Sequence, residues 1–285
     1  MDTIRYSTGI DIGSTCAKGA LFDGERLFTE IIPTGWNLRE SGENILNLLS
    51  KSSGISIKDK SIITATGYGR DSIPSASKKI TEITCHARGA HYFNPEVRTV
   101  IDVGGQDSKA IAVGDKGQVL EFIMNDRCTA GTGRFLQVMA HVLGTEVDEL
   151  EDLARGSEPV TINSMCAVFA ESEVISLLAR GISTESIAAG ILESIAGKII
   201  HLTGRVNVED HVIFIGGVSQ NSVIRNTLGT RIGKSISTHP QGQFAGAVGA
   251  ALIGFESLRK NKMKFDRAYL TAIEERIFSE GIRQK

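Results

Sequence analysis

Short apolar runs bounded by glycine turns alternate along the chain with longer stretches of helical spacing. Runs of strand length predict strands, and Asp23-Gly24 between two of them is a hairpin signal. Stretches with apolar residues every three or four positions predict helices, as with Ile45, Leu48 and Leu49. The expected strands cover residues 7–12, 17–22, 26–32, 61–66, 98–103, 108–113, 118–124, 211–215 and 235–238. The expected helices cover residues 42–53, 80–93, 132–143, 146–155, 167–180, 184–206, 220–229, 243–259 and 266–282.

Two of the predicted strand–turn–strand segments are copies of one another. Residues 11 onward read DIGSTCAKGALFDGERLFTEI, and residues 102 onward read DVGGQDSKAIAVGDKGQVLEFI. The acidic residue, the first glycine and the lysine match at one offset of 91 positions (102 − 11): Asp11 with Asp102, Gly13 with Gly104, and Lys18 with Lys109. A fixed offset argues against two unrelated glycine hairpins. The doubling predicts two lobes that hold one phosphate-bearing ligand between them.

Each copy carries residue types that approach a phosphate group. Glycine after a strand lets backbone N–H groups come close to phosphate oxygens, and Ser14 and Thr15 add hydroxyl donors. Asp11 and Asp102 end their strands, where a carboxylate can hold water around Mg²⁺. The two matching lysines either add positive charge or are outward-facing strand residues.

A third segment, VIFIGGVSQNSVIRNTL over residues 212–228, has the same character. An apolar strand, a Gly-Gly turn and a helix N-terminus form a geometry that nucleotides approach. Gly216 and Gly217 would let an adenosine lie flat against the backbone, next to Val218. Asn221 lies near the helix start and is either a ligand contact or only a helix cap.

Length and composition narrow the class of protein. The 285 residues accommodate two lobes better than one. A formal net charge of −2 and a pI of about 6.3 speak against a nucleic-acid or membrane-surface protein. The N-terminus lacks a long apolar signal core, and the apolar runs are far shorter than the roughly 20 residues of a membrane helix. We therefore expect a cytoplasmic protein, in which the four cysteines form no structural disulfides.

At this point the chain resembles the ATPase superfamily that includes actin, Hsp70 chaperones and sugar kinases. Two phosphate motifs, an adenosine motif and two interlobe helices, at residues 80–93 and 243–255, all have candidates. The resemblance implies an α/β fold of two lobes with ribonuclease-H-like cores and with ATP and Mg²⁺ in the cleft. The first lobe is expected to comprise residues 1–96 and 243–285, and the second residues 97–242.

The resemblance implies that the glycine loops bind ATP. Asp11 and Asp102 are the candidate Mg²⁺ ligands and catalytic carboxylates. Gln106 follows the second glycine pair, where its side chain could orient the attacking water, and Asp107 either assists or caps the turn. The candidate ATP contacts are Gly13, Ser14, Thr15, Cys16, Lys18, Gly104, Gly105, Gln106, Asp107, Gly216, Gly217, Val218 and Asn221.

Two of the cysteines have a distinctive setting. Cys128 and Cys166 each directly precede a predicted helix, whose positive dipole end stabilises a thiolate. Their separation of 38 residues (166 − 128) is neither a zinc-knuckle nor a one-chain ferredoxin spacing. An iron–sulfur cluster takes four thiolates, which a two-fold dimer would supply. The spacing by itself favours two buried free cysteines.

The sequences that flank the cysteines favour cluster ligands over buried free cysteines. Six segments of the chain closely resemble the activator proteins of 2-hydroxyacyl-CoA dehydratases, in the BadF/BadG/BcrA/BcrD ATPase family. They are NDRCTAGTGRFL, NSMCAVFAESEV, DIGSTCAKGALF, TCHARGA, DVGGQDSK and FIGGVSQN. The resemblance covers about residues 8–258. It implies that Cys128 and Cys166 bind one [4Fe-4S] cluster between two subunits. Cys16, in the phosphate loop, and Cys85, on the first interlobe helix, do not match cluster ligands.

The family resemblance implies an ATP-driven one-electron donor. Ferredoxin or flavodoxin would reduce the homodimer, and ATP would move the lobes and the helices after Cys128 and Cys166. The electron would pass to an iron–sulfur dehydratase or reductase. Three alternatives stay open: a component of an ATP-dependent aryl-CoA reductase, a small-molecule kinase, and a non-redox assembly ATPase. Glu171 and Glu173, after Cys166, are either functional or only a solvated helix face.

Overall fold

The computed structural model describes residues 6–126, 129–163 and 166–260. The first of its two five-stranded sheets has the strand order β3-β2-β1-β4-β5. In this sheet β1, β2 and β3 pair antiparallel, while β4 and β5 add in parallel. The strands are β1 (Tyr6–Ile12), β2 (Cys16–Phe22), β3 (Leu27–Pro33), β4 (Ser61–Thr66) and β5 (Lys78–Lys79).

The second sheet repeats this topology with the order β10-β9-β6-β7-β8. Again three consecutive strands pair antiparallel, and two later ones join in parallel. Asp11 lies opposite Lys18 in the first sheet, just as Asp102 lies opposite Lys109 in the second. The doubled segment of the sequence is therefore a doubled hairpin. The strands are β6 (Thr99–Val103), β7 (Ser108–Val113), β8 (Val119–Asn125), β9 (Val212–Ile215) and β10 (Ile236–Thr238).

The helices follow the predicted spacing with local differences at their ends. The first begins earlier than expected because the side chain of Asn37 accepts a hydrogen bond from the Glu40 N–H and caps it. The segment predicted as one helix over 146–155 is a short 3₁₀ turn followed by α5. The segment 266–282 lies outside the described residues. The helices are α1 (Leu38–Ser53), α2 (Ile57–Lys60), α3 (Glu82–Phe93), α4 (Gly133–Leu143), α5 (Leu150–Ala154), α6 (Ala167–Ala179), α7 (Thr184–Thr203), α8 (Ser222–Ile232) and one over residues 245–260.

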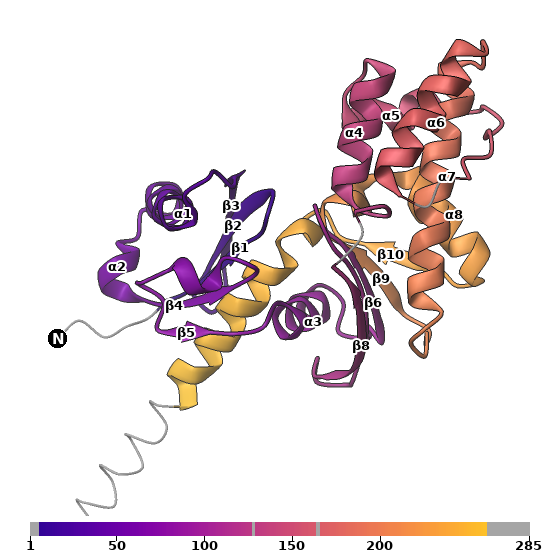
Figure 1. The fold of residues 1–285 in the computed structure, drawn as a ribbon. Helices are drawn as coiled ribbons and strands as arrows, with labels where there is room; N and C mark the ends of the chain where they lie inside the picture. Colours follow the sequence, from indigo (N-terminus) through magenta and orange to yellow (C-terminus); the bar gives the residue numbers. More distant parts are fainter. Residues whose placement is uncertain (1–5, 127–128, 164–165, 261–285) are drawn as a thin grey trace, which may run out of the picture.

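Helices α4 to α8 gather on the side of the second sheet away from the first sheet (Figure 1). The apolar α7 is their centre and packs against α5 and α8. It is long and apolar enough to cross a membrane by length and composition, yet 61% of that window is buried inside the protein. Its burial among the other helices identifies α7 as the core helix of this lobe.

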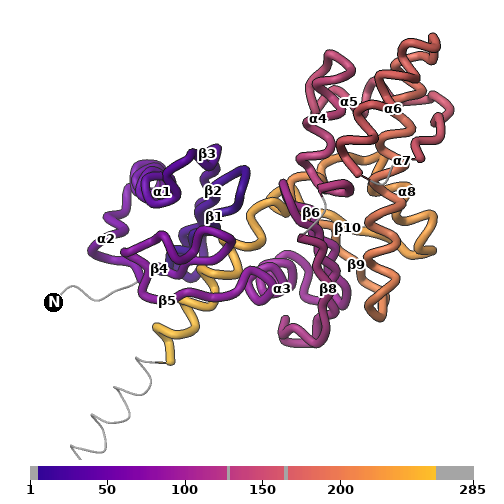
Figure 2. Tube along the Cα trace, viewed as in Figure 1, coloured from indigo at the N-terminus to yellow at the C-terminus, as the bar shows by residue number. Residues whose placement is uncertain are grey.

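Two helices cross between the sheets, α3 and the helix over residues 245–260 (Figures 1 and 2). A Cβ on Gly249 would lie 1.8 Å from the carbonyl oxygen of Cys85, and one on Gly89 would lie 2.0 Å from that of Ala245. Only glycine permits so close a crossing, which explains why the helix over residues 245–260 is rich in small residues where it meets α3. Helix α3 contacts the second sheet, whereas the helix over 245–260 packs on the first. The lobe boundary near residue 96 stays a prediction.

Candidate functional site

A cavity of about 820 Å³ lies between the two lobes. The loop over residues 13–15 borders it from the first lobe, and the loop over 104–107 borders it from the second. The turn at Gly216 and Gly217 closes a third side. Every residue predicted to contact ATP lines this cavity: Gly13, Ser14, Thr15, Cys16, Lys18, Gly104, Gly105, Gln106, Asp107, Gly216, Gly217, Val218 and Asn221. The structure thus brings together three segments, and Asn221 of the last lies 208 positions after Gly13 of the first (221 − 13).

The two glycine loops have the same turn and touch one another. The Gly13 N–H donates to the Cys16 carbonyl at 3.1 Å, and the Gly104 N–H donates to the Asp107 carbonyl at 2.9 Å. A Cβ on Gly105 would lie 2.1 Å from the hydroxyl oxygen of Thr15. The lobes are therefore closed at this point, and the second loop needs glycine for the contact.

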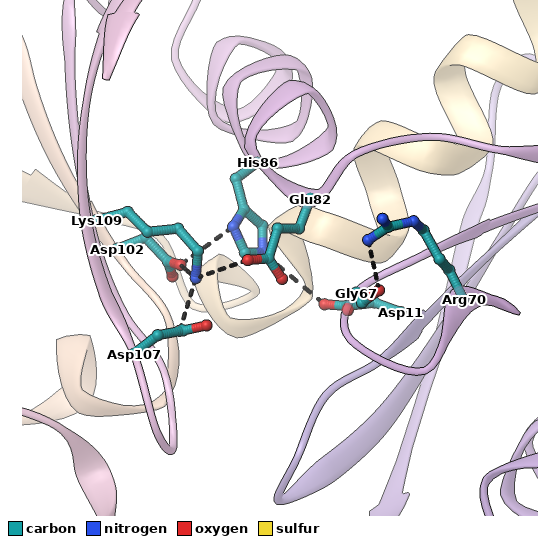
Figure 3. Close-up of polar contacts among 8 residues, drawn as sticks. All are labelled: Asp11, Gly67, Arg70, Glu82, His86, Asp102, Asp107 and Lys109. Atoms are coloured by element: carbon teal, nitrogen blue, oxygen red, sulfur yellow. Dashed lines mark hydrogen bonds and ion pairs between the residues drawn. The ribbon is translucent and has the colours of Figure 1, made fainter. Parts of the chain in front are cut away.

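A buried charge network, whose side chains are drawn in Figure 3, lines part of the cavity. Asp11 lies near the end of β1 and Asp102 lies on β6, with 5% and 2% of their surfaces exposed. The ring of His86 lies between them, with Nδ1 3.1 Å from an Asp102 oxygen and Nε2 3.8 Å from an Asp11 oxygen. The Nδ1 contact is an ion pair of the protonated ring, and Nδ1 makes no hydrogen bond. Lys109 donates hydrogen bonds to Asp102 at 3.1 Å and to Asp107 at 2.6 Å.

The network keeps its members charged despite their burial. Burial opposes the charged form of Asp102, but the charges of His86 and Lys109 hold its pKa well below the usual value. Burial likewise opposes the charged form of Asp11, and the contact with His86 and the charge of Lys18 lower its pKa. Burial would lower the pKa of His86, yet Asp102 raises it to about 10. At neutral pH, two carboxylates therefore face the cavity next to an imidazolium and an ammonium.

The two matched lysines have different surroundings. Lys109 is only 1% exposed and points into the network, so it is not an outward-facing strand residue. Lys18 is partly buried and also lines the cavity. Asp107 is held by Lys109, which restrains the turn that carries Gln106. Gln106 itself is exposed at the cavity wall, outside the buried network.

The third segment presents a turn that only glycine can form. Gly216 has φ 86°, and a Cβ there would lie 2.3 Å from the Val103 carbonyl and 2.7 Å from an Asp102 oxygen. Gly217 is exposed to the cavity, with no atom near where a Cβ would be. Asn221 caps α8 by accepting a hydrogen bond from the Ile224 N–H at 2.9 Å, and it lines the cavity as well.

Several residues of the cavity had no predicted role. His86 and Glu82 lie one turn apart on α3, and both face the network (Figure 3). Burial raises the pKa of Glu82, and Lys109, 3.7 Å away, opposes this rise. The spacing of an acid and a histidine at i and i+4 was the available signal. The other unassigned residues are Ile31, Tyr68, Asp126, Gly133, Leu136, Gln137, Val147, Asp148, Glu151, Gln220 and Gln243.

The cysteines are in different environments. Cys128 lies outside the described residues. Cys166 is exposed at the start of α6, directly before the helix as expected. Cys16 is partly buried at the cavity, while burial raises the pKa of the Cys85 thiol to about 12. Within the described residues, no three His, Cys, Asp or Glu side chains form a metal-binding group, so a cluster would need further thiolates beside that of Cys166.

Large apolar side chains are exposed on the helix that follows Cys166. Val168, Phe169 and Ile175 on α6 are 67%, 68% and 53% exposed. Glu173, on the same helix, accepts hydrogen bonds from the Asn163 N–H at 3.0 and 3.1 Å. Glu173 is thus bound to the segment that leads to Cys166 and is not simply part of a solvated face.

The second glycine loop is hydrogen-bonded to the start of α4. The Gly133 N–H donates to the Gly104 carbonyl at 2.9 Å, and the Arg134 N–H donates to the Gly105 carbonyl at 2.8 Å. The loop over 104–107 is therefore bound directly to the beginning of α4, which starts five residues after Cys128 (133 − 128).

Comparison with known proteins agrees with this geometry. The model of the BadF/BadG/BcrA/BcrD ATPase family matches residues 8–254. The (R)-2-hydroxyglutaryl-CoA dehydratase activating ATPase of Acidaminococcus fermentans is 42% identical over 259 residues, which are 90% of this chain and 99% of that protein. One of the subunits of the benzoyl-CoA reductase of Thauera aromatica is 34% identical over 264 residues, 88% of this chain and 93% of that protein.

A solved structure gives the same result for the fold. The activator of the 2-hydroxyisocaproyl-CoA dehydratase from Clostridium difficile with bound ADPNP has a TM-score of 0.86 and 40% sequence identity. The match covers 91% of this chain and 97% of that chain. It confirms the expected α/β fold of the actin and Hsp70 type, and this relative binds a nucleotide.

Proposed function

The chain belongs to the BadF/BadG/BcrA/BcrD ATPase family, and on that premise we propose that it is an ATP-dependent one-electron donor for a 2-hydroxyacyl-CoA dehydratase or a related iron–sulfur acceptor. One observation carries the nucleotide part: two glycine loops, two carboxylates and the Gly216 turn line a single cavity between the lobes. The ADPNP-bound neighbour supports the same ligand class. The names of the relatives support the dehydratase as partner.

In this proposal the cavity residues divide the work on ATP. The N–H groups of the two glycine loops bind the phosphates, and Gly217 lies against the adenosine. Asp11 and Asp102 would hold Mg²⁺, which neutralises charge on the phosphates. Carboxylates that stay ionised in a polar cleft are the ligand type that this cation takes. Gln106, exposed at the cavity wall, orients the attacking water.

Cys128 and Cys166 would supply two thiolates from each of two copies of the chain. Four thiolates hold one [4Fe-4S] cluster, which supplies a one-electron redox centre when bound. The exposure of Cys166 and of its apolar neighbours Val168 and Phe169 supports a homodimer with this face at its interface. A ferredoxin or flavodoxin is the electron donor in this proposal. A cytoplasmic location agrees with it, since thiols stay reduced there.

ATP acts on this centre through the second glycine loop. Closure around the phosphates moves the loop over 104–107, and its carbonyls are bonded to Gly133 and Arg134. Helix α4 therefore follows the loop and changes the surroundings of the thiolate before its start. Nucleotide binding can shift this equilibrium only as far as its affinity differs between the two lobe arrangements.

A second candidate is a component of an ATP-dependent aryl-CoA reductase of the benzoyl-CoA type. The 34% identity to a component of benzoyl-CoA reductase supports it. The two candidates share the ATP site and the cysteines, and they differ in assembly. A homodimer that works with a separate acceptor supports the first, whereas the second requires stable co-purification with non-identical subunits from the native host.

The proposal is tested by electron delivery from the purified, reduced chain. The protein is reduced without oxygen, freed of reductant, and mixed with a 2-hydroxyisocaproyl-CoA dehydratase in the presence of MgATP, MgADPNP or no nucleotide. We expect loss of the reduced visible spectrum with MgATP only, at one electron per dimer. Equal rates in all three mixtures would overturn ATP-driven transfer, and a colourless protein with full ATPase activity would support the kinase or assembly alternatives.

A further inference from the structure

Glu151, on α5, joins the helices of the second lobe to the turn at Gly216 and Gly217. Its carboxylate accepts a hydrogen bond of 2.9 Å from the Ser222 N–H and another from the Ser222 hydroxyl. Ser222 is the first residue of α8 and directly follows Asn221, which lines the cavity. Glu151 lines the same cavity. Its carboxylate therefore lies beside the segment that the proposed function assigns to adenosine.

The two hydrogen bonds hold the carboxylate in one orientation and leave it further acceptor sites. Each oxygen of a carboxylate offers about two lone-pair sites, and Ser222 occupies one site on each oxygen. Arg155 adds an ion pair at 3.7 Å from Oε1. The Glu151 side chain is 21% exposed and lines the cavity. An acceptor that is already oriented is thus available to a ligand bound there.

The chemistry of a nucleotide determines which of its groups this acceptor can bind. A carboxylate accepts hydrogen bonds and donates none, and it repels the phosphates, which carry charge of the same sign. The groups of ATP that donate hydrogen bonds are the two ribose hydroxyls and the adenine amino group. The vicinal hydroxyls match the two oxygens of one carboxylate, whereas the amino group lies at the end of the base that is far from the sugar. Leu136, Val147 and Val218 line the cavity with apolar surface, which suits the base better than a carboxylate does.

We propose that Glu151 is a specificity-determining residue, whose carboxylate binds the ribose hydroxyls of the nucleotide and selects ribonucleotides over deoxyribonucleotides. The inference rests on the ATP-binding part of the proposed function and is independent of the iron–sulfur part. A site that binds a hydroxyl group discriminates against an analogue without it, because a polar group of the site then loses its partner. Ser222 acts through Glu151 and is a positioning residue.

The test measures dissociation constants of ADP, 2′-deoxy-ADP and 3′-deoxy-ADP for the full chain with Mg²⁺, by calorimetry. ADP is used because it is the product of ATP hydrolysis and is not consumed. We expect wild type to bind ADP about 10-fold more tightly than at least one of the deoxynucleotides. Glu151→Gln keeps only one acceptor oxygen and should lower this ratio to about threefold or less, mainly by weakening ADP. Ser222→Ala should give an intermediate ratio, because its carboxylate partner is less firmly held.

Asp152→Asn is the matched control. Asp152 follows Glu151 on α5, and its carboxylate accepts a hydrogen bond of 2.9 Å from Arg155. Its side chain is 80% exposed. The substitution removes the same unit of negative charge as Glu151→Gln, so it separates the effect of charge from that of the hydrogen bonds. It should keep the wild-type ratio.

Several outcomes would overturn the proposal. Equal affinity of wild type for all three nucleotides does so, and so does an unchanged ratio in Glu151→Gln, which would make Glu151 only a structural link between α5 and α8. A Glu151→Gln protein that loses its preference for ADP over inosine diphosphate, with the ribose ratio unchanged, would assign the carboxylate to the base. If Glu151→Gln does not fold, an unchanged ratio in Ser222→Ala overturns the proposal.

The same titrations distinguish this inference from the proposed function. A wild-type chain that binds none of the nucleotides defeats the proposed function, and the assignment of Glu151 with it. A chain that binds ADP but does not select ribose defeats the assignment of Glu151 alone. A chain that selects ribose but holds no iron defeats the redox proposal alone.

Discussion

The hydroxyl of Ser108 donates a hydrogen bond of 2.7 Å to the carbonyl of Gly131, and Ser108 is buried. Ser108 directly follows the loop over 104–107, whereas Gly131 lies three residues after Cys128 (131 − 128). Gly131 has φ 96°, so its backbone conformation is one that other residues rarely adopt. This bond joins the second glycine loop to the segment that follows the proposed cluster ligand.

Replacing Ser108 by alanine should weaken the coupling of the two sites. We expect Ser108→Ala to keep ATPase activity within about threefold of wild type and to lose about 1 kcal/mol of stability, the usual size of one buried hydrogen bond. The rate at which a chelator removes iron should then depend less on MgATP, because only the bonds of the Gly104 and Gly105 carbonyls to α4 remain. Ser61→Ala is the matched control, since Ser61 is buried and hydrogen-bonded to Thr8 in the first sheet. An unchanged response to MgATP in Ser108→Ala would show that another route carries the coupling.

The carboxylate of Glu173 should hold the backbone of Asn163. Glu173 accepts two hydrogen bonds from the Asn163 N–H, and a charged acceptor is worth about 1 kcal/mol more than a neutral one. Glu173→Gln should therefore raise the rate of hydrogen exchange at the Asn163 amide about fivefold. Glu171→Gln, on the same helix, is the control and should leave this rate unchanged. Equal exchange rates in both variants would show that Glu173 does not hold this backbone group.

Gly216 and Gly217 should respond to alanine in opposite ways. Gly216→Ala forces a Cβ to within 2.3 Å of the Val103 carbonyl at a positive φ, so we expect a loss of stability of about 2 kcal/mol or more. Gly217→Ala has open space around its Cβ and should fold with wild-type stability. It should nevertheless weaken ATP binding, because its methyl group would occupy the cavity. Thermal unfolding and ATP titration separate the two effects, and wild-type ATP affinity in Gly217→Ala would exclude contact with the adenosine.

The pH dependence of stability should carry the signature of His86. Its pKa is 6.5 in the unfolded chain and about 10 in the folded one. A raised pKa means that the folded state holds the proton more tightly. The resulting stabilisation is complete below about pH 6.5 and is lost as the pH rises towards 10, by up to about 1.4 kcal/mol per pH unit. Asp102, whose pKa is lowered in the folded protein, has its effect at low pH: its contribution to stability is lost as the pH falls into the acid range.

Urea unfolding between about pH 6 and pH 10 measures this signature. The stability difference between wild type and His86→Gln should shrink as the pH rises over this interval, because the wild type alone loses the His86 contribution. His91→Gln, compared in the same way, should show no such trend, because His91 lies on the same helix and its ring is bonded to the Asp115 carbonyl, at 3.0 Å, away from the network. Parallel curves for wild type and His86→Gln would mean that His86 is neutral in the folded protein.

The doubled hairpin was predictable because its determinants are local. A glycine turn between two apolar runs specifies the same structure in both copies, and the shared offset of Asp11 and Asp102 implied a common ligand. Helix ends were harder to predict from the sequence, as the cap at Asn37 shows. The two-residue strand β5 was not predicted, because it forms only by pairing with β4. The position of His86 between Asp11 and Asp102 depends on contacts between segments far apart in the chain, and the i, i+4 spacing with Glu82 indicated only a shared helix face.

The cysteines show the same limit. Placement of Cys166 directly before a helix followed from periodicity, whereas its exposure did not, because a free cysteine at a helix start is as readily buried. Exposure is a property of the packed lobe. Val168, Phe169 and Ile175 on α6 are exposed in the single chain, and this exposure supports the proposed interface.

The central claim is that two copies of this chain hold one iron–sulfur cluster through Cys128 and Cys166. Its most direct test is the iron content, EPR spectrum and mass in solution of protein purified without oxygen. The account predicts a dimer with about four irons per two chains, with iron lost in Cys128→Ala and in Cys166→Ala and kept in Cys85→Ala. Two results would contradict it. One is a protein that still contains no iron after iron–sulfur reconstitution but hydrolyses ATP, and the other is full iron content in Cys166→Ala.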